Sequence, residues 1–113
     1  MSKRNDGDVL RDIQEAVRRI VTYTSGMTFD AFLADPKTQD AVVRNLEIIG
    51  EATKNLSDEI RSQNPRLPWK GMAGMRDRLI HHYFGVNIDI VWQIVTAELP
   101  DVACQIEEMR RKA

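Results

Sequence analysis

The fold is decided by residues 36–62, PKTQDAVVRNLEIIGEATKNLSDEIRS, whose hydrophobic positions recur every three or four residues. This spacing places the apolar side chains along one face of an α-helix. Asp35 before Pro36 favours a helix start, with Asp35 as the N-cap and Pro36 in the first turn. Asn64-Pro65 favours an end near Ser62. We therefore predict one long helix with a buried stripe made of Val42, Leu46, Ile49, Thr53, Leu56 and Ile60.

The same helix carries further apolar residues outside this stripe, which are Ala41, Val43, Ile48 and Ala52. A helix that is apolar on two sides lies either at the centre of a core or in a subunit interface. We therefore expect the protein to form a homodimer.

Helical periodicity extends over the rest of the chain, and no strand-like alternation competes with it. We predict a first helix over 6–24, a short turn capped by Thr28, a loop at 64–68, and a helix from Trp69 to Tyr83. The last helical region begins near residue 87, and Pro100 kinks it or begins a new helix there. The sequence therefore predicts a single all-α domain over residues 1–113, an up-and-down four-helix bundle with a short extra helix.

Composition limits the class of protein. The 113 residues are 42% hydrophobic and 29% charged, as in folded globular domains. The 16 Lys and Arg nearly balance the 17 Asp and Glu, so bulk charge does not indicate a strongly basic nucleic-acid binder. One cysteine, Cys104, can form neither an internal disulfide nor a zinc cluster. Without an apolar run long enough for a bilayer or a signal peptide, we expect a cytoplasmic protein with no membrane partner.

The polar residues of 71–84, GMAGMRDRLIHHYF, are not explained by packing. Both histidines, two arginines, an aspartate and one of the two tyrosines fall within eight residues of this segment. On a regular helix Arg76 and Tyr83 share a face, whereas His81 lies about 140° around the axis from Arg76. The three side chains therefore converge only if the helix is irregular near Gly85 or a second copy of the motif lies across a dimer axis.

These residue types are suited to cutting RNA without a metal ion. An imidazole such as His81 can activate the ribose 2′-hydroxyl, and a guanidinium such as Arg76 can stabilise the charge on phosphorus. DNA lacks that hydroxyl, so DNA is not an expected substrate. Asp77 lies four residues before His81 and could hold one imidazole nitrogen. His81 and His82 are adjacent, point apart on a helix and are poor joint metal ligands, so we expect no metal or other cofactor.

Two other interpretations of the cluster stay open at this point. It could bind phosphate without chemistry, as part of a dimeric module that binds a nucleotide or a nucleotidyltransferase. It could also be a structural network of ion pairs between helices, in which case removing the Arg76 side chain would lower stability.

The spacing Arg76-x4-His81-x-Tyr83 resembles the signature of HepT, a ribonuclease toxin family of the HEPN superfamily. The resemblance continues through residues 46–52, LEIIGEA, through Pro68-Trp69, and through Glu98-Leu99-Pro100, so it covers nearly the whole chain. It implies a dimeric HEPN bundle in which two copies of the motif face each other in a cleft.

The resemblance also implies roles for individual residues. His81 would be the catalytic acid and base, Arg76 the cation beside the phosphate, and RNA the substrate. The implied partner is an MntA-type nucleotidyltransferase antitoxin, which would transfer AMP from ATP to Tyr83, so that the added phosphates compete with RNA. Asp77 stands where the family often has Asn, and its carboxylate adds negative charge beside the motif.

Overall fold

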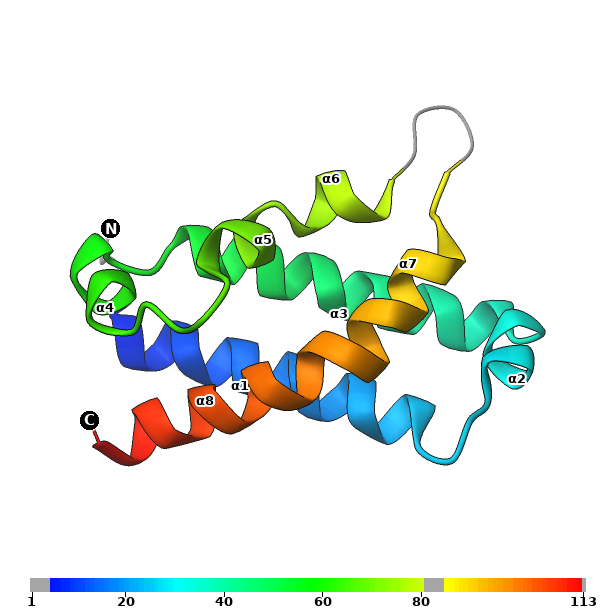
Figure 1. The fold of residues 1–113 in the computed structure, drawn as a ribbon, viewed down its shortest axis with the longest axis horizontal. Helices are drawn as coiled ribbons and strands as arrows, with labels where there is room; N and C mark the ends of the chain where they lie inside the picture. Colours follow the sequence, from blue (N-terminus) through cyan, green and yellow to red (C-terminus); the bar gives the residue numbers. More distant parts are fainter. Residues whose placement is uncertain (1–4, 81–84, 113) are drawn as a thin grey trace.

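The computed structural model of the chain describes residues 5–80 and 85–112 and is built from helices (Figure 1). Over the described residues, no helix is long and apolar enough to cross a bilayer. The helices are α1 (Asp6–Thr24), α2 (Phe29–Leu33), α3 (Pro36–Lys54), α4 (Asp58–Gln63), α5 (Trp69–Ala73), α6 (Met75–Leu79), α7 (Ile88–Gln93), the π-helical turn η2 (Ile94–Glu98) and α8 (Leu99–Lys112).

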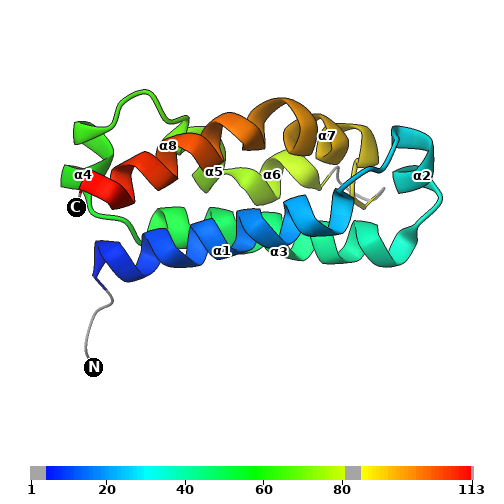
Figure 2. The same ribbon diagram turned by 90° about the horizontal axis from the view of Figure 1, so that it is seen from below.

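These elements form two layers (Figure 2). Helices α1 and α3 lie antiparallel in one layer, while α5, α6 and the continuous rod α7–η2–α8 form the other. The short helices α2 and α4 lie at opposite ends of the bundle. The chain runs up, down, up and down through its four helical lengths, so the predicted all-α bundle is confirmed.

Three helix starts follow from capping residues in the sequence. The side chain of Asn5 accepts a hydrogen bond from the Asp8 amide at 2.8 Å, and Thr28 accepts one from the Ala31 amide at 3.1 Å. Asp35 accepts bonds from the Thr38 hydroxyl at 2.7 Å and the Thr38 amide at 3.0 Å. These two bonds hold the pKa of the Asp35 carboxyl below its ordinary value, and the bond from the Thr38 hydroxyl has the larger effect. The predicted starts at Asp6, Phe29 and Pro36 are therefore confirmed.

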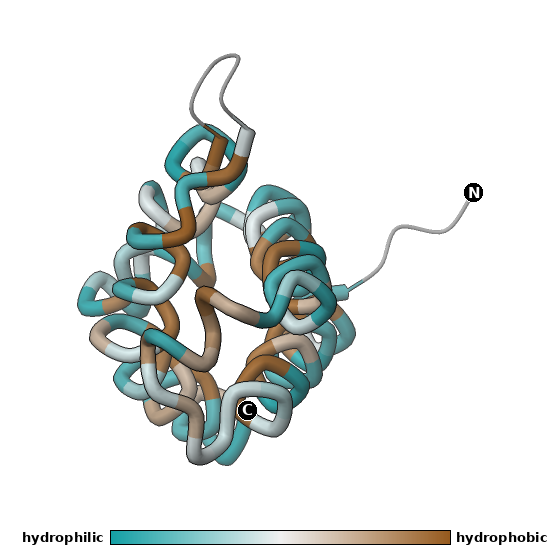
Figure 3. The backbone as a smooth tube through the Cα atoms, turned by 90° about the vertical axis from the view of Figure 1, so that its right-hand side faces the viewer, coloured by the Kyte–Doolittle hydropathy of each residue, from teal (hydrophilic) through white to brown (hydrophobic). Residues whose placement is uncertain are grey.

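The core lies between the two layers, and hydrophobic and hydrophilic residues alternate along each helix that faces it (Figure 3). The α3 stripe is buried as predicted from Val42 to Leu56. Both tryptophans anchor elements of the second layer. The Trp92 ring of α7 contacts Phe32 of α2 with centroids 5.1 Å apart, and Trp69 Nε1 donates to the Asn64 carbonyl at 2.9 Å.

The predicted long helix over 36–62 is wrong in its second half, because α3 ends at Lys54 and α4 begins at Asp58. The break is held by Asp6, whose carboxylate accepts bonds from the Ser57 amide at 2.9 Å and hydroxyl at 2.6 Å. The Ser57 hydroxyl also accepts a bond from the Ile60 amide and so caps α4. A contact between residues 51 positions apart therefore overrides the local periodicity.

The predicted helix over 69–83 is also corrected by the structure. It breaks at Gly74 into α5 and α6, and α6 ends at Leu79. Ile80 is extended, with φ −97° and ψ 123°, and forms an isolated antiparallel bridge with Val86. The Asn87 amide donates to the Leu79 carbonyl at 2.8 Å beside this bridge.

The disturbance predicted at Pro100 takes the form of the π-helical turn η2. Pro100 has no amide hydrogen, so it cannot donate to the Thr96 carbonyl. Just before it, the Leu99 amide donates to the Ile94 carbonyl, five residues back, as in a π-helix. The rod therefore stays helical from Ile88 to Lys112 and widens by one residue in the turn before Pro100.

Gly50 allows a close approach of the two layers. A Cβ atom at this position would lie 3.1 Å from the Met72 carbonyl oxygen and 3.1 Å from the Met75 Cβ. The absence of a side chain at Gly50 therefore permits this close helix contact. A Cβ at Gly71, by contrast, would have its nearest neighbour, the Arg78 guanidinium, at an ordinary 3.6 Å.

We expect Gly50→Ala to lower the free energy of unfolding by about 1 kcal/mol or more. Overpacking costs about 1–3 kcal/mol, and the higher helix propensity of alanine offsets about 1 kcal/mol of it. Gly71→Ala is the matched control, because its methyl group has room and it should keep or raise stability. Denaturant unfolding of both variants tests this, and an equal effect of the two substitutions would contradict the contact at Gly50.

Candidate functional site

Helix α6 presents two of the predicted site residues, Arg76 and Asp77. Met75 and Leu79 are 2% and 0% exposed, and they anchor the helix in the core beneath the Gly50 contact. Arg76 and Asp77 lie between these anchors in sequence and are both exposed to solvent. The Arg76 guanidinium is therefore accessible to a phosphate from solution.

The other predicted site residues, His81 and Tyr83, lie outside the described residues, as does His82. The expectation that Asp77 and His81 share a helical face depends on α6 continuing beyond Leu79. It does not continue, because Ile80 is extended. The structure does bring Ile80 and Val86, on either side of 81–84, together in their antiparallel bridge.

Arg78 forms a bidentate ion pair with Glu98 of η2. Its Nη1 donates to Oε1 at 3.0 Å and its Nη2 donates to Oε2 at 2.6 Å. The pair joins α6 to the rod α7–η2–α8 across 20 residues of sequence. Sequence reasoning missed this pair, although Arg78 lies inside the motif segment and Glu98 inside the recurring Glu98-Leu99-Pro100.

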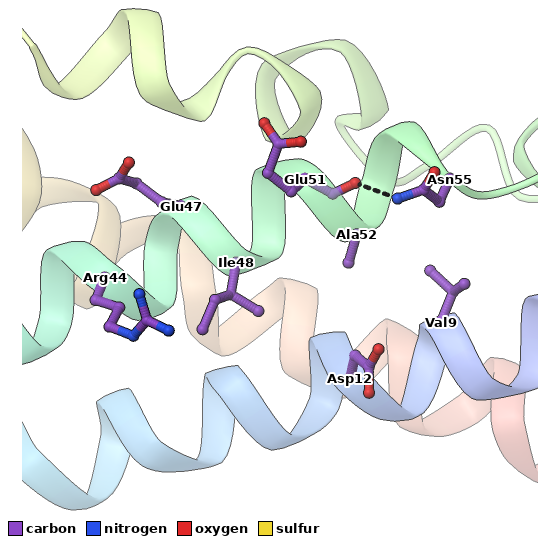
Figure 4. A pocket seen from close by; sticks show the side chains of 8 residues that line it. All are labelled: Val9, Asp12, Arg44, Glu47, Ile48, Glu51, Ala52 and Asn55. Atoms are coloured by element: carbon purple, nitrogen blue, oxygen red, sulfur yellow. Dashed lines mark hydrogen bonds between the residues drawn. The ribbon is translucent and has the colours of Figure 1, made fainter. Parts of the chain in front are cut away.

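A groove of about 620 Å³ lies on the outer side of the layer formed by α1 and α3 (Figure 4). Glu47 and Glu51 point from α3 toward the α5 and α6 side of this groove, whereas Arg44 points toward α1. The lining residues are Val9, Asp12, Arg44, Glu47, Ile48, Glu51, Ala52 and Asn55.

Glu51 belongs to the LEIIGEA segment of α3. It lines this groove, and its carboxylate pairs with Lys54 of the same helix at 3.3 Å. Two of the apolar residues outside the α3 stripe, Ile48 and Ala52, lie in the same groove and are half-buried.

The charges of the groove and of α6 favour different ligands. The groove is lined by three carboxylates and one guanidinium, so a nucleic-acid backbone gains little there. On α6, by contrast, Arg76 offers a fixed cation suited to phosphate. Among the described residues, no three His, Cys, Asp or Glu side chains gather as a metal site requires. The exposed guanidinium of Arg76 on α6 and the mostly acidic groove on α1 and α3 are therefore distinct features of the surface.

Comparison with known proteins gives a consistent result. A sequence family described as "Ribonuclease HepT-like" matches residues 13–109. "Putative RNase MJ0127" of Methanocaldococcus jannaschii is 50% identical over 109 residues, which are 96% of this chain and 90% of that protein. "Probable ribonuclease HepT" of Thermococcus cleftensis is 45% identical over 109 residues, covering 96% of this chain and 99% of that protein. No solved structure gives a significant match.

Proposed function

Because the chain belongs to the HepT-like ribonuclease family, we propose that it is a metal-independent RNA endonuclease and the toxin of a toxin–antitoxin pair. The observation that carries the proposal is the family match across residues 13–109, which includes the whole segment from Arg76 to Tyr83. The exposed position of Arg76 on α6 supports it, because a phosphate-binding residue must be reachable by RNA.

In the proposed reaction His81 takes the proton of a ribose 2′-hydroxyl. The 2′-oxygen then attacks the adjacent phosphorus, and the bond from phosphorus to the 5′-oxygen breaks. The leaving 5′-oxygen receives a proton from an imidazolium, so the products are a 2′,3′-cyclic phosphate and a 5′-hydroxyl. Arg76 stabilises the negative charge that develops on the phosphoryl oxygens.

The proposed antitoxin is an MntA-type nucleotidyltransferase that modifies Tyr83. The phenol oxygen would attack the α-phosphorus of ATP, forming a tyrosyl-AMP bond and releasing pyrophosphate. The added phosphate places negative charge in the same motif as Arg76, and so competes with RNA for this cation. The resemblance of Arg76-x4-His81-x-Tyr83 to the HepT signature supports this regulation.

The proposed assembly is a homodimer in which two copies of the motif face each other and the outer face of α3 contributes to the interface. Half-buried Ile48 and Ala52 support it, because they lie in the groove on the outer side of α1 and α3, and among the described residues Figure 2 shows no other helix beyond that layer. Arg44 and Glu51 both line the groove and lie about 10.5 Å apart along the axis of α3. In an antiparallel pair of α3 helices, each Arg44 would lie at the same level along the axis as the Glu51 of the other subunit.

We expect the purified protein to cleave RNA in the presence of EDTA and to leave DNA and 2′-O-methylated RNA intact. His81→Ala and Arg76→Ala should each slow cleavage by about 100-fold or more, because each removes a group needed in the transition state. Arg66→Ala, which changes an exposed arginine of the 64–68 loop, is the matched control.

Three outcomes would contradict parts of this proposal. If His81→Ala cleaves as fast as the wild type, the site is wrong. If RNA binds in a phosphate-dependent way but a broad panel of RNAs stays uncut, the protein is a binding module. If Arg76→Ala lowers the melting temperature strongly, the polar cluster is a structural network, since loss of a solvent-exposed catalytic side chain leaves stability nearly unchanged.

Co-expression with a nucleotidyltransferase of its own organism should raise the intact mass of the protein by one or more AMP units. The modified protein should no longer cleave RNA, because the new phosphates occupy Arg76. Tyr83→Phe should abolish the mass increase. Tyr23→Phe, which changes an exposed tyrosine on α1, is the control and should keep it. Modification of the Tyr83→Phe variant would show that another residue is the acceptor.

Charge reversal tests the proposed dimer. Arg44→Glu and Glu51→Arg should each raise the dissociation constant about tenfold or more, because each places like charges opposite one another. The double variant restores opposite charges and should dimerise like the wild type. Sedimentation equilibrium measures all three. A monomeric wild type would refute the dimer, and a dimer indifferent to both single reversals would place the interface elsewhere.

A further inference from the structure

We propose that the ion pair between Arg78 and Glu98 positions helix α6, and through it Arg76, for the cleavage reaction. This inference rests on the ribonuclease function proposed above. Arg78 and Glu98 are then positioning residues, which act through Arg76 and need no contact with RNA.

The geometry of the pair is suited to fixing an orientation. Two parallel bonds, at 3.0 and 2.6 Å, join the guanidinium fork to both carboxylate oxygens. Such a bidentate arrangement restrains angle as well as distance. The guanidinium also lies within ordinary contact distance of the place where Gly71 of α5 would carry a Cβ. The ion pair itself links two elements of this layer, α6 and η2.

Helix α6 depends on such external restraints. It has five residues, and neither its N-terminus nor that of α5 is capped by a side chain. A helix this short is unstable by itself. Met75 and Leu79 hold its apolar side in the core, and Arg78 supplies the polar restraint. Arg76 and Arg78 lie about 200° apart around the axis. Anchoring Arg78 to Glu98 therefore leaves Arg76 on a different side, exposed to solvent.

Glu98 is presented by a long continuous helical segment. It is the last residue of η2, within the helical rod from Ile88 to Lys112 that packs on α1. Ile80 and Val86, which form the antiparallel bridge, both lie between Arg78 and Glu98 in the sequence. Pair and bridge together restrain the chain on both sides of the segment that contains His81 and Tyr83.

We expect the pair to act mainly on the placement of Arg76 and only weakly on the stability of the fold. Its side chains are 33% and 35% exposed, and pairs open to solvent contribute little to the free energy of unfolding. A small displacement of a catalytic group, in contrast, can cost up to about 100-fold in rate. Loss of the pair should therefore change turnover more than melting temperature.

The first experiment compares the wild type with Arg78→Gln, Glu98→Gln and the double variant. We expect each single variant to lower kcat about tenfold, with KM within about twofold of the wild-type value. The double variant should be no worse than either single one, because both remove one interaction. Arg61→Gln is the matched control, because Arg61 also forms an ion pair, with Asp58. The Arg61 side chain is 30% exposed, similar to the 33% of Arg78. Its kcat should stay unchanged, and its melting temperature should match those of the test variants.

Other roles of the pair give other results. If Arg78 contacts RNA directly, Arg78→Gln raises KM while Glu98→Gln leaves kcat unchanged. If the pair serves stability alone, the melting temperature falls in both variants and kcat well below that temperature stays at the wild-type value. Either result would overturn the proposal.

Hydrogen exchange tests the pair without relying on activity. In both single variants, the amides of Arg78 and Ile80, which bond to the Gly74 and Arg76 carbonyls, should exchange several-fold faster. Amides in the middle of α1 and α3 should keep their rates. A wild type that fails to cut RNA refutes the ribonuclease proposal, whereas unchanged exchange in α6 refutes the positioning of α6 by this pair.

Discussion

The contact at Gly50 is the constraint on which the rest of the structure depends. At this residue the backbone of α3 meets the junction of α5 and α6 so closely that a Cβ would lie 3.1 Å from the Met72 carbonyl oxygen. This contact sets the separation of the two layers at the place where the motif segment begins. Met75, which follows the junction, can then reach the core, and Arg76 beside it is left at the surface. A helix signature without an evident chemical role, LEIIGEA, thus has a steric role in placing the residues that carry chemistry.

In the second layer, the short helices α5 and α6 place the functional groups. Helices α1 and α3 have 19 residues each, whereas α5 and α6 have five each and are separated by Gly74. Short helices hold their shape only through tertiary contacts, so their position responds to a few side chains. This layer contains the glycine contact, the Arg78–Glu98 pair and the π-helical turn. The capped helices α1 and α3 provide the stable base on which it rests.

The sequence predicted the elements that depend on neighbouring residues. The caps at Thr28 and Asp35, the loop at 64–68 and the buried stripe of α3 are all encoded within a few positions. Prediction from the sequence failed where contacts between distant residues determine where a helix ends. The break between α3 and α4 depends on Asp6, and the end of α6 depends on the pairing of Ile80 with Val86. The same limit applies to the site. Residue types and spacing singled out Arg76 and Asp77, but the partner of Arg78 is a carboxylate 20 residues away, which periodicity cannot reveal.

The distribution of charge reconciles a net charge of −1 with an RNA substrate. RNA affinity requires positive potential where the phosphate binds, and the average over the whole chain matters less. Carboxylates gather instead in the α1–α3 groove, where Asp12, Glu47 and Glu51 lie with a single arginine. In the proposed dimer each Arg44 would approach these acids on the other subunit and neutralise part of their charge. Association would then reduce the repulsion that RNA meets near α3 and leave the guanidinium of Arg76 as the cation it encounters on α6.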